Sequence, residues 1–170
     1  MTIRNALCRA LTLVVLAATL PAMAQEGGAP LLIGASLPLS GPNAGAGQEG
    51  LAVAKAYFDS VNKAGGINGR KIVLNALDDA FNPQQAADNT RKLIDEKAVA
   101  IFNCWGTASC SAMMPLIQQA GVPMVAGIAG GGPMRQQPGQ YAFNVRPTTE
   151  AEIQRMVSQM TTLGQKAIAV

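Results

Sequence analysis

The chain has 170 residues, of which 49% are hydrophobic, 14% charged and 4% aromatic, and this composition fits a folded globular protein better than a disordered one. It contains no histidine. A Ser-His-Asp or Cys-His relay, a histidine general base and a zinc site built on histidine are therefore excluded. An enzyme of this composition would have to use carboxylates, lysine or a cofactor.

The first 24 residues have the pattern of an export signal. Arg4 and Arg9 flank a short basic segment, and Leu11–Leu20 is an apolar run of ten residues. Residues 22–24, Ala-Met-Ala, match a small-x-small cleavage site. Ten apolar residues are too few to span a bilayer, which favours a cleaved signal over an uncleaved anchor. We therefore expect cleavage after Ala24 and an exported mature protein.

The mature chain has little net charge and two cysteines. Removing the two arginines of the signal reduces the 13 basic residues to 11, against 10 acidic ones, so the charge balance does not indicate a nucleic-acid partner. In an oxidising compartment Cys104 and Cys110 can pair, provided that their Cα atoms come within about 7 Å. The alternative, to which we give equal weight, is that the two cysteines stay unpaired and pack in the core as small hydrophobic residues. The sequence leaves both open.

Short apolar runs alternate with amphipathic stretches along the mature chain. The apolar runs predict buried strands at residues 31–37, 71–77, 98–103, 122–126 and 141–145. The stretches between them predict helices from about Leu51 to Gly65, from Asn82 with Gln85 completing a capping box, and over about 109–120. Strands that alternate with helices predict an α/β fold, with a parallel sheet flanked by helices on both faces.

A further helix is predicted after the fifth strand. Thr149 and Glu152 form a second capping box, and the helix ends at Gly164. Its apolar stripe consists of Ile153, Met156, Val157, Met160 and Leu163. Lys166–Val170 then begins another strand. We expect the stripe, over about 150–163, to find few partners and to form an exposed apolar patch that promotes aggregation.

Ligands of open parallel sheets bind beyond the carboxyl ends of the strands. Five loops should gather there, at residues 38–47, 78–82, 104–109, 127–133 and 146–150. The turn at residues 106–109 is a candidate carboxylate site, because backbone N–H groups at a helix N-terminus favour anions. Alternatively, Thr107 or Ser109 only caps its own helix.

Gly45, Gly47 and Gly50 form a literal G-x-G-x-x-G before a helix, and Asp78 or Asp79 ends the next strand, where a ribose-binding acid would lie. The context argues against a dinucleotide site. The segment 38–44 separates the strand from the first glycine, and the acid lies 28 residues beyond Gly50 instead of about 20. We prefer a turn-forming role for these glycines. A Rossmann-type, NAD(P)-dependent oxidoreductase remains the second hypothesis.

Five motifs in a fixed order resemble those of one family. They are IGASLPLSGP at 33–42, NKAGGINGR at 62–70, Asp78-Asp79 followed by Asn82-Pro83, GVPMV at 121–125 and FNVR at 143–146. Together they resemble the type I periplasmic solute-binding proteins of ABC importers, and the leucine/isoleucine/valine-binding group in particular. The resemblance extends over residues 31–170.

The resemblance implies a two-lobed clamshell that binds a solute between its lobes and delivers it to an ABC permease at the inner membrane. Catalysis, a cofactor and a metal are not expected. Residues 25–147 then form the N-terminal lobe. Residues 148–170 form the hinge, near 148–150, with the first helix and strand of a truncated second lobe. A sensory ligand-binding protein is a third hypothesis.

The resemblance also implies which loops hold the ligand. Family members bind an amino-acid carboxylate through the loop after the third strand, with further contacts from the loop after the fourth strand. The corresponding residues here are Thr107, Ala108, Ser109, Ile128, Ala129 and Gly130, and Thr149 is a further candidate for ligand binding.

Two departures from the family pattern bear on the ligand. The first loop often supplies an aromatic side chain, but Ala46 occupies that position, and Ile128-Ala-Gly130 lacks a common hydroxyl. Branched-chain amino acids are therefore in doubt, and aromatic acids and amides become candidates. Trp105 is either an apolar wall of the site or a packing residue.

Other polar residues have simpler interpretations. Arg135 and Arg146 carry guanidinium groups that pair well with carboxylates. Surface solvation of Arg135 and an ion pair of Arg146 near the hinge are the interpretations that we favour. The pair Asp78-Asp79 is expected to close the loop after the second strand, since no second carboxylate pair or metal-ligand set accompanies it.

Overall fold

The computed structural model describes residues 27–132, 134, 139–165 and 167. The predicted export signal, Arg135 and all but residue 167 of the strand expected at 166–170 lie outside the described residues. Within the described part of the chain, no helix is both long and apolar enough to cross a bilayer.

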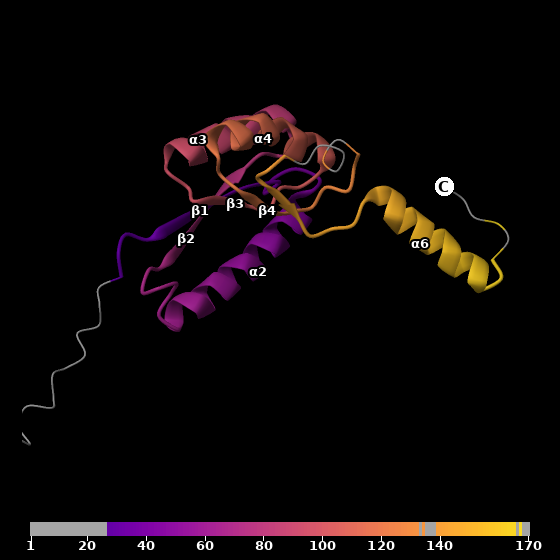
Figure 1. The fold of residues 1–170 in the computed structure, drawn as a ribbon, viewed down its shortest axis with the longest axis horizontal. Coiled ribbons are helices and arrows are strands. Elements are labelled where there is room, and N and C mark those ends of the chain that lie inside the picture. The colour runs from indigo at the N-terminus through magenta and orange to yellow at the C-terminus, as the bar shows by residue number, and fades with distance from the viewer. Residues whose placement is uncertain (1–26, 133, 135–138, 166, 168–170) are drawn as a thin grey trace, which may run out of the picture.

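A single sheet of five parallel strands forms the centre of the fold (Figure 1). Its strands are β1 (Leu31–Leu37), β2 (Ile72–Asp78), β3 (Ala100–Phe102), β4 (Met124–Gly127) and β5 (Ala142–Asn144). They are ordered β2-β1-β3-β4-β5. All seven residues of β1 pair with β2, in a register from Leu31 opposite Ile72 to Leu37 opposite Asp78. The parallel α/β sheet predicted from the alternating apolar runs is confirmed.

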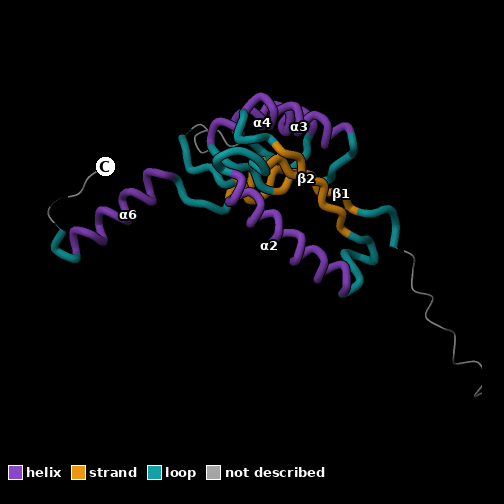
Figure 2. The backbone as a smooth tube through the Cα atoms, turned by 180° about the vertical axis from the view of Figure 1, so that it is seen from behind, coloured by secondary structure: helices purple, strands orange, loops and turns teal. Residues whose placement is uncertain are grey.

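Helices cover the two faces of the sheet unequally. They are α2 (Ala44–Lys63), α3 (Pro83–Asp95), α4 (Thr107–Ala120) and α6 (Thr149–Thr162). Figures 1 and 2 show α3 and α4 side by side on one face and α2 alone on the other. The last of these helices, α6, extends away from the sheet without a buried residue.

The main core lies between the sheet and the pair α3 and α4. Five of its large side chains have no exposed surface, namely Leu93, Ile101, Met113, Ile117 and Met124. Burying each such side chain stabilises the fold by about 1.5–3 kcal/mol. A Cβ at Gly34 would lie 2.9 Å from a methyl carbon of Leu93, so the glycine allows α3 to approach β1 closely.

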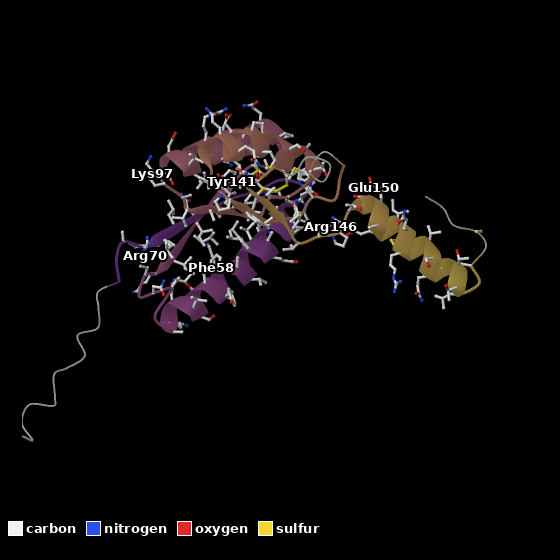
Figure 3. All side chains as sticks on the ribbon, viewed as in Figure 1. Phe58, Arg70, Lys97, Tyr141, Arg146 and Glu150 are labelled. Atoms are coloured by element: carbon white, nitrogen blue, oxygen red, sulfur yellow. A yellow bond between two sulfur atoms is a disulfide. The ribbon has the colours of Figure 1, made fainter. Side chains whose placement is uncertain are left out.

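The opposite face has less cover. On α2, Phe58 points toward the sheet (Figure 3) and packs edge-on against Phe102 of β3, with ring centroids 5.6 Å apart. Val125 and Phe143 are paired on β4 and β5, farther along the sheet, and Phe143 is 54% exposed. The apolar surface of this face therefore continues beyond the part covered by α2.

The start of α3 confirms half of the predicted capping box. The side chain of Asn82 accepts a hydrogen bond of 3.0 Å from the backbone N–H of Gln85. The side chain of Gln85 does not complete the box, because it donates to Asn89 one turn further along the helix. Asn82 is therefore a simple N-cap, which satisfies one of the free N–H groups of the first turn.

The capping box predicted at the start of α6 is wrong by one residue. Thr148, not Thr149, is the N-cap, and its hydroxyl accepts a hydrogen bond of 3.1 Å from the N–H of Ala151. Glu152 instead forms two hydrogen bonds of 2.7 Å with the guanidinium of Arg146. The ion pair expected for Arg146 is thus confirmed.

Candidate functional site

The loops after β3 and β4 lie side by side at the carboxyl edge of the sheet. Trp105 and Ile128 form an isolated parallel bridge. The N–H of Ile128 donates to the carbonyl of Cys104 at 2.9 Å, and the N–H of Gly106 donates to the carbonyl of Ile128 at 3.3 Å. Two of the loops predicted to meet at this edge are therefore joined by backbone hydrogen bonds.

The turn before α4 presents a helix start to this edge. Gly106 is the N-cap, with a φ of 84°, and no side chain caps the helix by a hydrogen bond. Neither Thr107 nor Ser109 caps the helix, so the capping interpretation of these two residues is wrong. Thr107 is half-buried, Ala108 is exposed and Ser109 is buried. The first N–H groups of an α-helix have no acceptor within the helix and attract anions.

A disulfide connects the two ends of this turn. Cys104 and Cys110 are paired with Cα atoms 5.5 Å apart, and neither residue has exposed surface. The bridge joins the end of β3 to the first turn of α4. The question that the sequence left open is answered in favour of pairing, and the turn between the cysteines is held at both ends.

Two glycines bring threonines from different loops to the same place. The N–H of Thr149 donates to the carbonyl of Gly130 at 2.9 Å, and a Cβ at Gly130 would lie 2.7 Å from the Thr149 hydroxyl. A Cβ at Gly131 would lie 2.7 Å from the side chain of Thr107. Thr107 of the loop after β3 and Thr149, which follows β5, thus both pack against the loop after β4.

The remaining predicted residues, Ala46 and Trp105, line an open groove of about 550 Å³ between α2 and β3. The groove is mainly apolar, and its other lining residues are Glu49, Gly50, Val53, Ala54, Tyr57, Phe58, Phe102 and Asn103. Thr107, Ser109 and Ile128 are not among its lining residues. The predicted site therefore divides into a polar turn and a neighbouring apolar groove. Trp105 connects the two, because it lies in the same loop as the polar turn and also lines the groove.

Sequence reasoning missed two residues at this edge. Asn103, at the end of β3, lines the groove. The ring of Phe81, from the loop after β2, would be 2.8 Å from a Cβ at Gly106, so it packs directly over the turn. The sequence predicts that the loop 78–82 lies at this edge, but only the three-dimensional arrangement shows which loop its aromatic side chain reaches.

A polar network fixes the loop that carries Phe81. The hydroxyl of Ser36 donates to buried Asp79 at 2.8 Å, and the N–H of Phe81 donates to the other carboxylate oxygen of Asp79 at 2.9 Å. Asp78 accepts hydrogen bonds from the backbone N–H groups of Leu39 and Ser40 in the loop after β1. The loop-closing role predicted for the two aspartates is confirmed.

The two neighbouring aspartates have opposite pKa shifts. Burial raises the pKa of Asp79, although its hydrogen bonds with Ser36 and Phe81 act in the other direction. Hydrogen bonds, first that of the Ser40 side chain, lower the pKa of exposed Asp78. Among the residues described, no group of three or more cysteine, aspartate or glutamate side chains could hold a metal ion.

The literal G-x-G-x-x-G does not form a phosphate-binding turn. Gly45, Gly47 and Gly50 all lie within α2, after its first residue. A Cβ at Gly47 would lie 2.1 Å from the carbonyl oxygen of Pro38, whereas Gly45 and Gly50 face open space. Gly47 is therefore needed for close packing of α2 on the loop after β1, which does not favour the oxidoreductase hypothesis.

A family model described as "Periplasmic binding protein" matches residues 30–170. The Leu/Ile/Val-binding protein homolog 8 of Brucella abortus (strain 2308) is 34% identical over 123 residues, which are 72% of this chain and 30% of that protein. A substrate-binding periplasmic protein from Ralstonia solanacearum has a similar structure, with a TM-score of 0.73 and 34% identity over 79% of this chain and 38% of that one.

A third relative was solved with a bound ligand. The solute-binding protein of an ABC transporter from Rhodopseudomonas palustris BisB5, in complex with 3,4-dihydroxybenzoic acid, has a TM-score of 0.61 and 26% identity over 70% of this chain and 32% of that one. The chain thus spans less than two fifths of each of these three proteins. The extent of the family match, together with the parallel sheet and its loops, shows that the chain belongs to the periplasmic binding protein family.

Proposed function

We propose that this chain is the solute-recognition part of a periplasmic binding protein that serves an ABC importer. The observation that carries the proposal is that Thr107 packs against Gly131 and Thr149 against Gly130, so that both threonines lie against the loop after β4. These residues come from three loops at the carboxyl edge of a parallel sheet, where the ligands of such folds bind. The polar turn would hold a small carboxylate-bearing solute.

The turn has the chemistry that a carboxylate needs. Its anion-binding groups are the first N–H groups of α4 and the hydroxyl of Thr107. A carboxylate at a helix N-terminus gains about 0.3–1 kcal/mol when exposed and up to about 2 kcal/mol when partly buried. The disulfide between Cys104 and Cys110 holds these donors in place before the solute arrives, and such preorganisation reduces the ordering cost of binding.

The groove favours a solute with a ring over a branched aliphatic one. The relative from Brucella is named for leucine, isoleucine and valine, and that from Rhodopseudomonas was solved with an aromatic acid. Here Ala46 is small and leaves room beside Trp105, and Phe58 and Phe102 add aromatic surface. We therefore place aromatic acids ahead of branched-chain amino acids as solutes.

The proposed setting follows from the family. A signal cleaved after Ala24 would export the protein to the periplasm. Residues 25–147 would form the first lobe, with a hinge near 148–150 leading to a second lobe that closes over the solute. The closed form would deliver the solute to a permease in the inner membrane. The relatives are named as binding proteins, and we propose binding without catalysis here too.

Thermal unfolding and calorimetry of the full-length protein would test this function. The panel would contain the twenty amino acids, benzoate, phenylacetate and their methyl esters. We expect at least one free acid to raise the melting temperature, since a ligand at about 100 times its Kd stabilises the folded state by about 2.7 kcal/mol. The matching ester should bind more weakly, because it lacks the charge. A protein that responds to no member of the panel contradicts the proposal.

Thr107→Val offers a test of the turn itself. Valine keeps the shape of threonine but removes the hydroxyl that the proposed carboxylate would contact. We expect a weaker affinity for the best acid by a factor of about 5–10, which corresponds to the net worth of one hydrogen bond. Thr162→Val, at the far end of α6, is the control and should leave the affinity unchanged.

A further inference from the structure

Two consecutive residues in the loop after β2 have a left-handed backbone although neither is glycine. Ala80 has a φ of 48° and Phe81 a φ of 63°. This conformation is crowded for every residue with a Cβ, and a bulky side chain in it is an outlier that the surrounding structure must hold in place. Phe81 is also 42% exposed, so burial in the core does not explain why an aromatic residue occupies this position.

The two aspartates before this pair hold it in the strained conformation. Oδ1 of Asp78 accepts a hydrogen bond of 2.9 Å from the N–H of Ala80. The carboxylate of Asp79 accepts one of 2.9 Å from the N–H of Phe81, and its carbonyl accepts one of 2.7 Å from the N–H of Asn82. The N–H groups of residues 80–82 therefore all have acceptors, and these hydrogen bonds offset the strain.

The strained backbone brings the ring of Phe81 to Gly106, the N-cap of α4. A Cβ at Gly106 would lie 2.8 Å from Cε2 and 2.9 Å from Cζ of the ring, so the far edge of the ring takes the space that a side chain would need. Gly106 is the one glycine between Cys104 and Cys110, and glycine has more backbone freedom than any other residue. The ring therefore packs on the point of the turn where the backbone is freest.

We propose that Phe81 is a positioning residue, whose ring fixes Gly106 and thereby the direction of the free N–H groups at the start of α4. This inference rests on the proposed function, and it adds a residue that acts on the solute through the turn. No side chain caps the start of α4, so the direction of these N–H groups depends on how the turn is held. Donors that are already fixed bind an anion more tightly, because less ordering is needed on binding.

The experiment measures by calorimetry how strongly the full-length protein prefers a free acid over its methyl ester. The probe is whichever of the twenty amino acids, benzoate and phenylacetate binds most tightly, together with its methyl ester. Phe81→Gly removes both the ring and the strain, and we expect it to reduce the ratio of the two affinities by a factor of about 3–10. Ala80→Gly is the matched control, because it relieves strain at the neighbouring residue and keeps the ring. It should leave the ratio unchanged.

Two further variants keep a side chain on the left-handed backbone and differ in reach. Methionine extends about as far as a phenylalanine ring, whereas leucine ends sooner. Phe81→Met should therefore retain more of the preference for the acid than Phe81→Leu. Thermal unfolding without ligand checks that each variant folds, and Phe81→Leu decides the question if Phe81→Gly does not fold.

The ratio separates a positioning role from a merely structural one. A loss of affinity that is equal for acid and ester in Phe81→Gly, an unchanged ratio there, or a ratio that falls as far in Ala80→Gly would overturn the inference and leave the proposed function intact. If the unmodified protein binds acid and ester equally, the role of the turn in holding a carboxylate fails together with the inference. If no member of the panel binds, the proposed function fails as well.

Discussion

Asp78 and Asp79 are adjacent but should affect stability in opposite directions as the pH changes. Both have an ordinary pKa of 3.8, and the folded protein raises that of Asp79 and lowers that of Asp78. A raised carboxyl pKa means that the folded state binds the proton more tightly than the unfolded state. The contribution of Asp79 is therefore complete below the unfolded pKa and is lost as the pH rises through its folded pKa.

Asp79→Asn tests this sign. Asparagine keeps an uncharged group of the same shape beside Ser36, so it removes the cost of a buried charge. We expect the free energy of unfolding of the variant, relative to the unmodified protein, to increase as the pH rises between about 3 and 7. Urea unfolding at several pH values provides the measurement. Asp78→Asn should show the opposite slope, and equal slopes would contradict the assignment.

Gly47 illustrates how one missing side chain positions a helix. Gly47→Ala would place a methyl group 2.1 Å from the carbonyl oxygen of Pro38. We expect the free energy of unfolding to fall by about 1–3 kcal/mol, the usual cost of overpacking. Gly50→Ala in the same helix faces open space and should raise it by up to about 1 kcal/mol. Denaturant unfolding would measure both, and similar changes in the two variants would contradict the packing argument.

At the scale of elements, α4 depends on the disulfide at its start. Replacing both Cys104 and Cys110 with alanine should lower the free energy of unfolding by about 2 kcal/mol, because the closed loop is short. The loss of the disulfide should affect the turn at residues 106–109 more than the rest of the fold. We expect faster hydrogen exchange at residues 106–109 and unchanged exchange in β2, measured by mass spectrometry. Uniformly faster exchange would mean that the bridge stabilises the whole fold without a particular effect on the turn.

The strands could be predicted from the sequence because each is a short apolar run between turn residues. The start of α2 could not, because its first two turns, Ala44 to Leu51, are mostly small residues without an apolar stripe. β3 is shorter than expected and covers only Ala100–Phe102. Asn103 after it has a left-handed backbone, which ends a strand but leaves no mark in an apolar pattern.

The candidate site could be predicted only as far as the loops. The parallel topology places the carboxyl ends of the strands together, so the loops of Thr107 and Gly130 are expected to gather at one edge, and the structure brings these two loops together. The contact of Phe81 with Gly106 and the place of Asn103 in the lining of the groove depend on how loops and side chains pack. No periodicity in the sequence encodes those contacts.

At the scale of the whole molecule, some apolar surfaces of the described residues are buried by neighbouring elements and others are exposed. The predicted stripe of α6 is exposed along its length, with Met156 60% and Leu163 68% exposed. The sheet also exposes Phe143 of β5 on the face of α2. An exposed apolar surface of this kind favours association with other molecules.

We expect the chain of residues 25–170 to self-associate through α6. Replacing Met156 and Met160 with glutamate should reduce the association measured by light scattering, because it places charge on the stripe. Ser158→Glu adds a charge to the opposite side of the helix, at a residue that is already polar, and should have a smaller effect. An equal effect of the control would show that net charge, and not the stripe, governs association.

The buried disulfide also bears on the order of events during biogenesis. Thiols remain reduced in a bacterial cytosol and pair after export. In the proposed route, the precursor would therefore cross the membrane before the disulfide between Cys104 and Cys110 has formed. Its donors would become fixed only in the compartment where the solute is to be captured. Premature loading with solute from inside the cell would thus be disfavoured by the chemistry of two sulfur atoms.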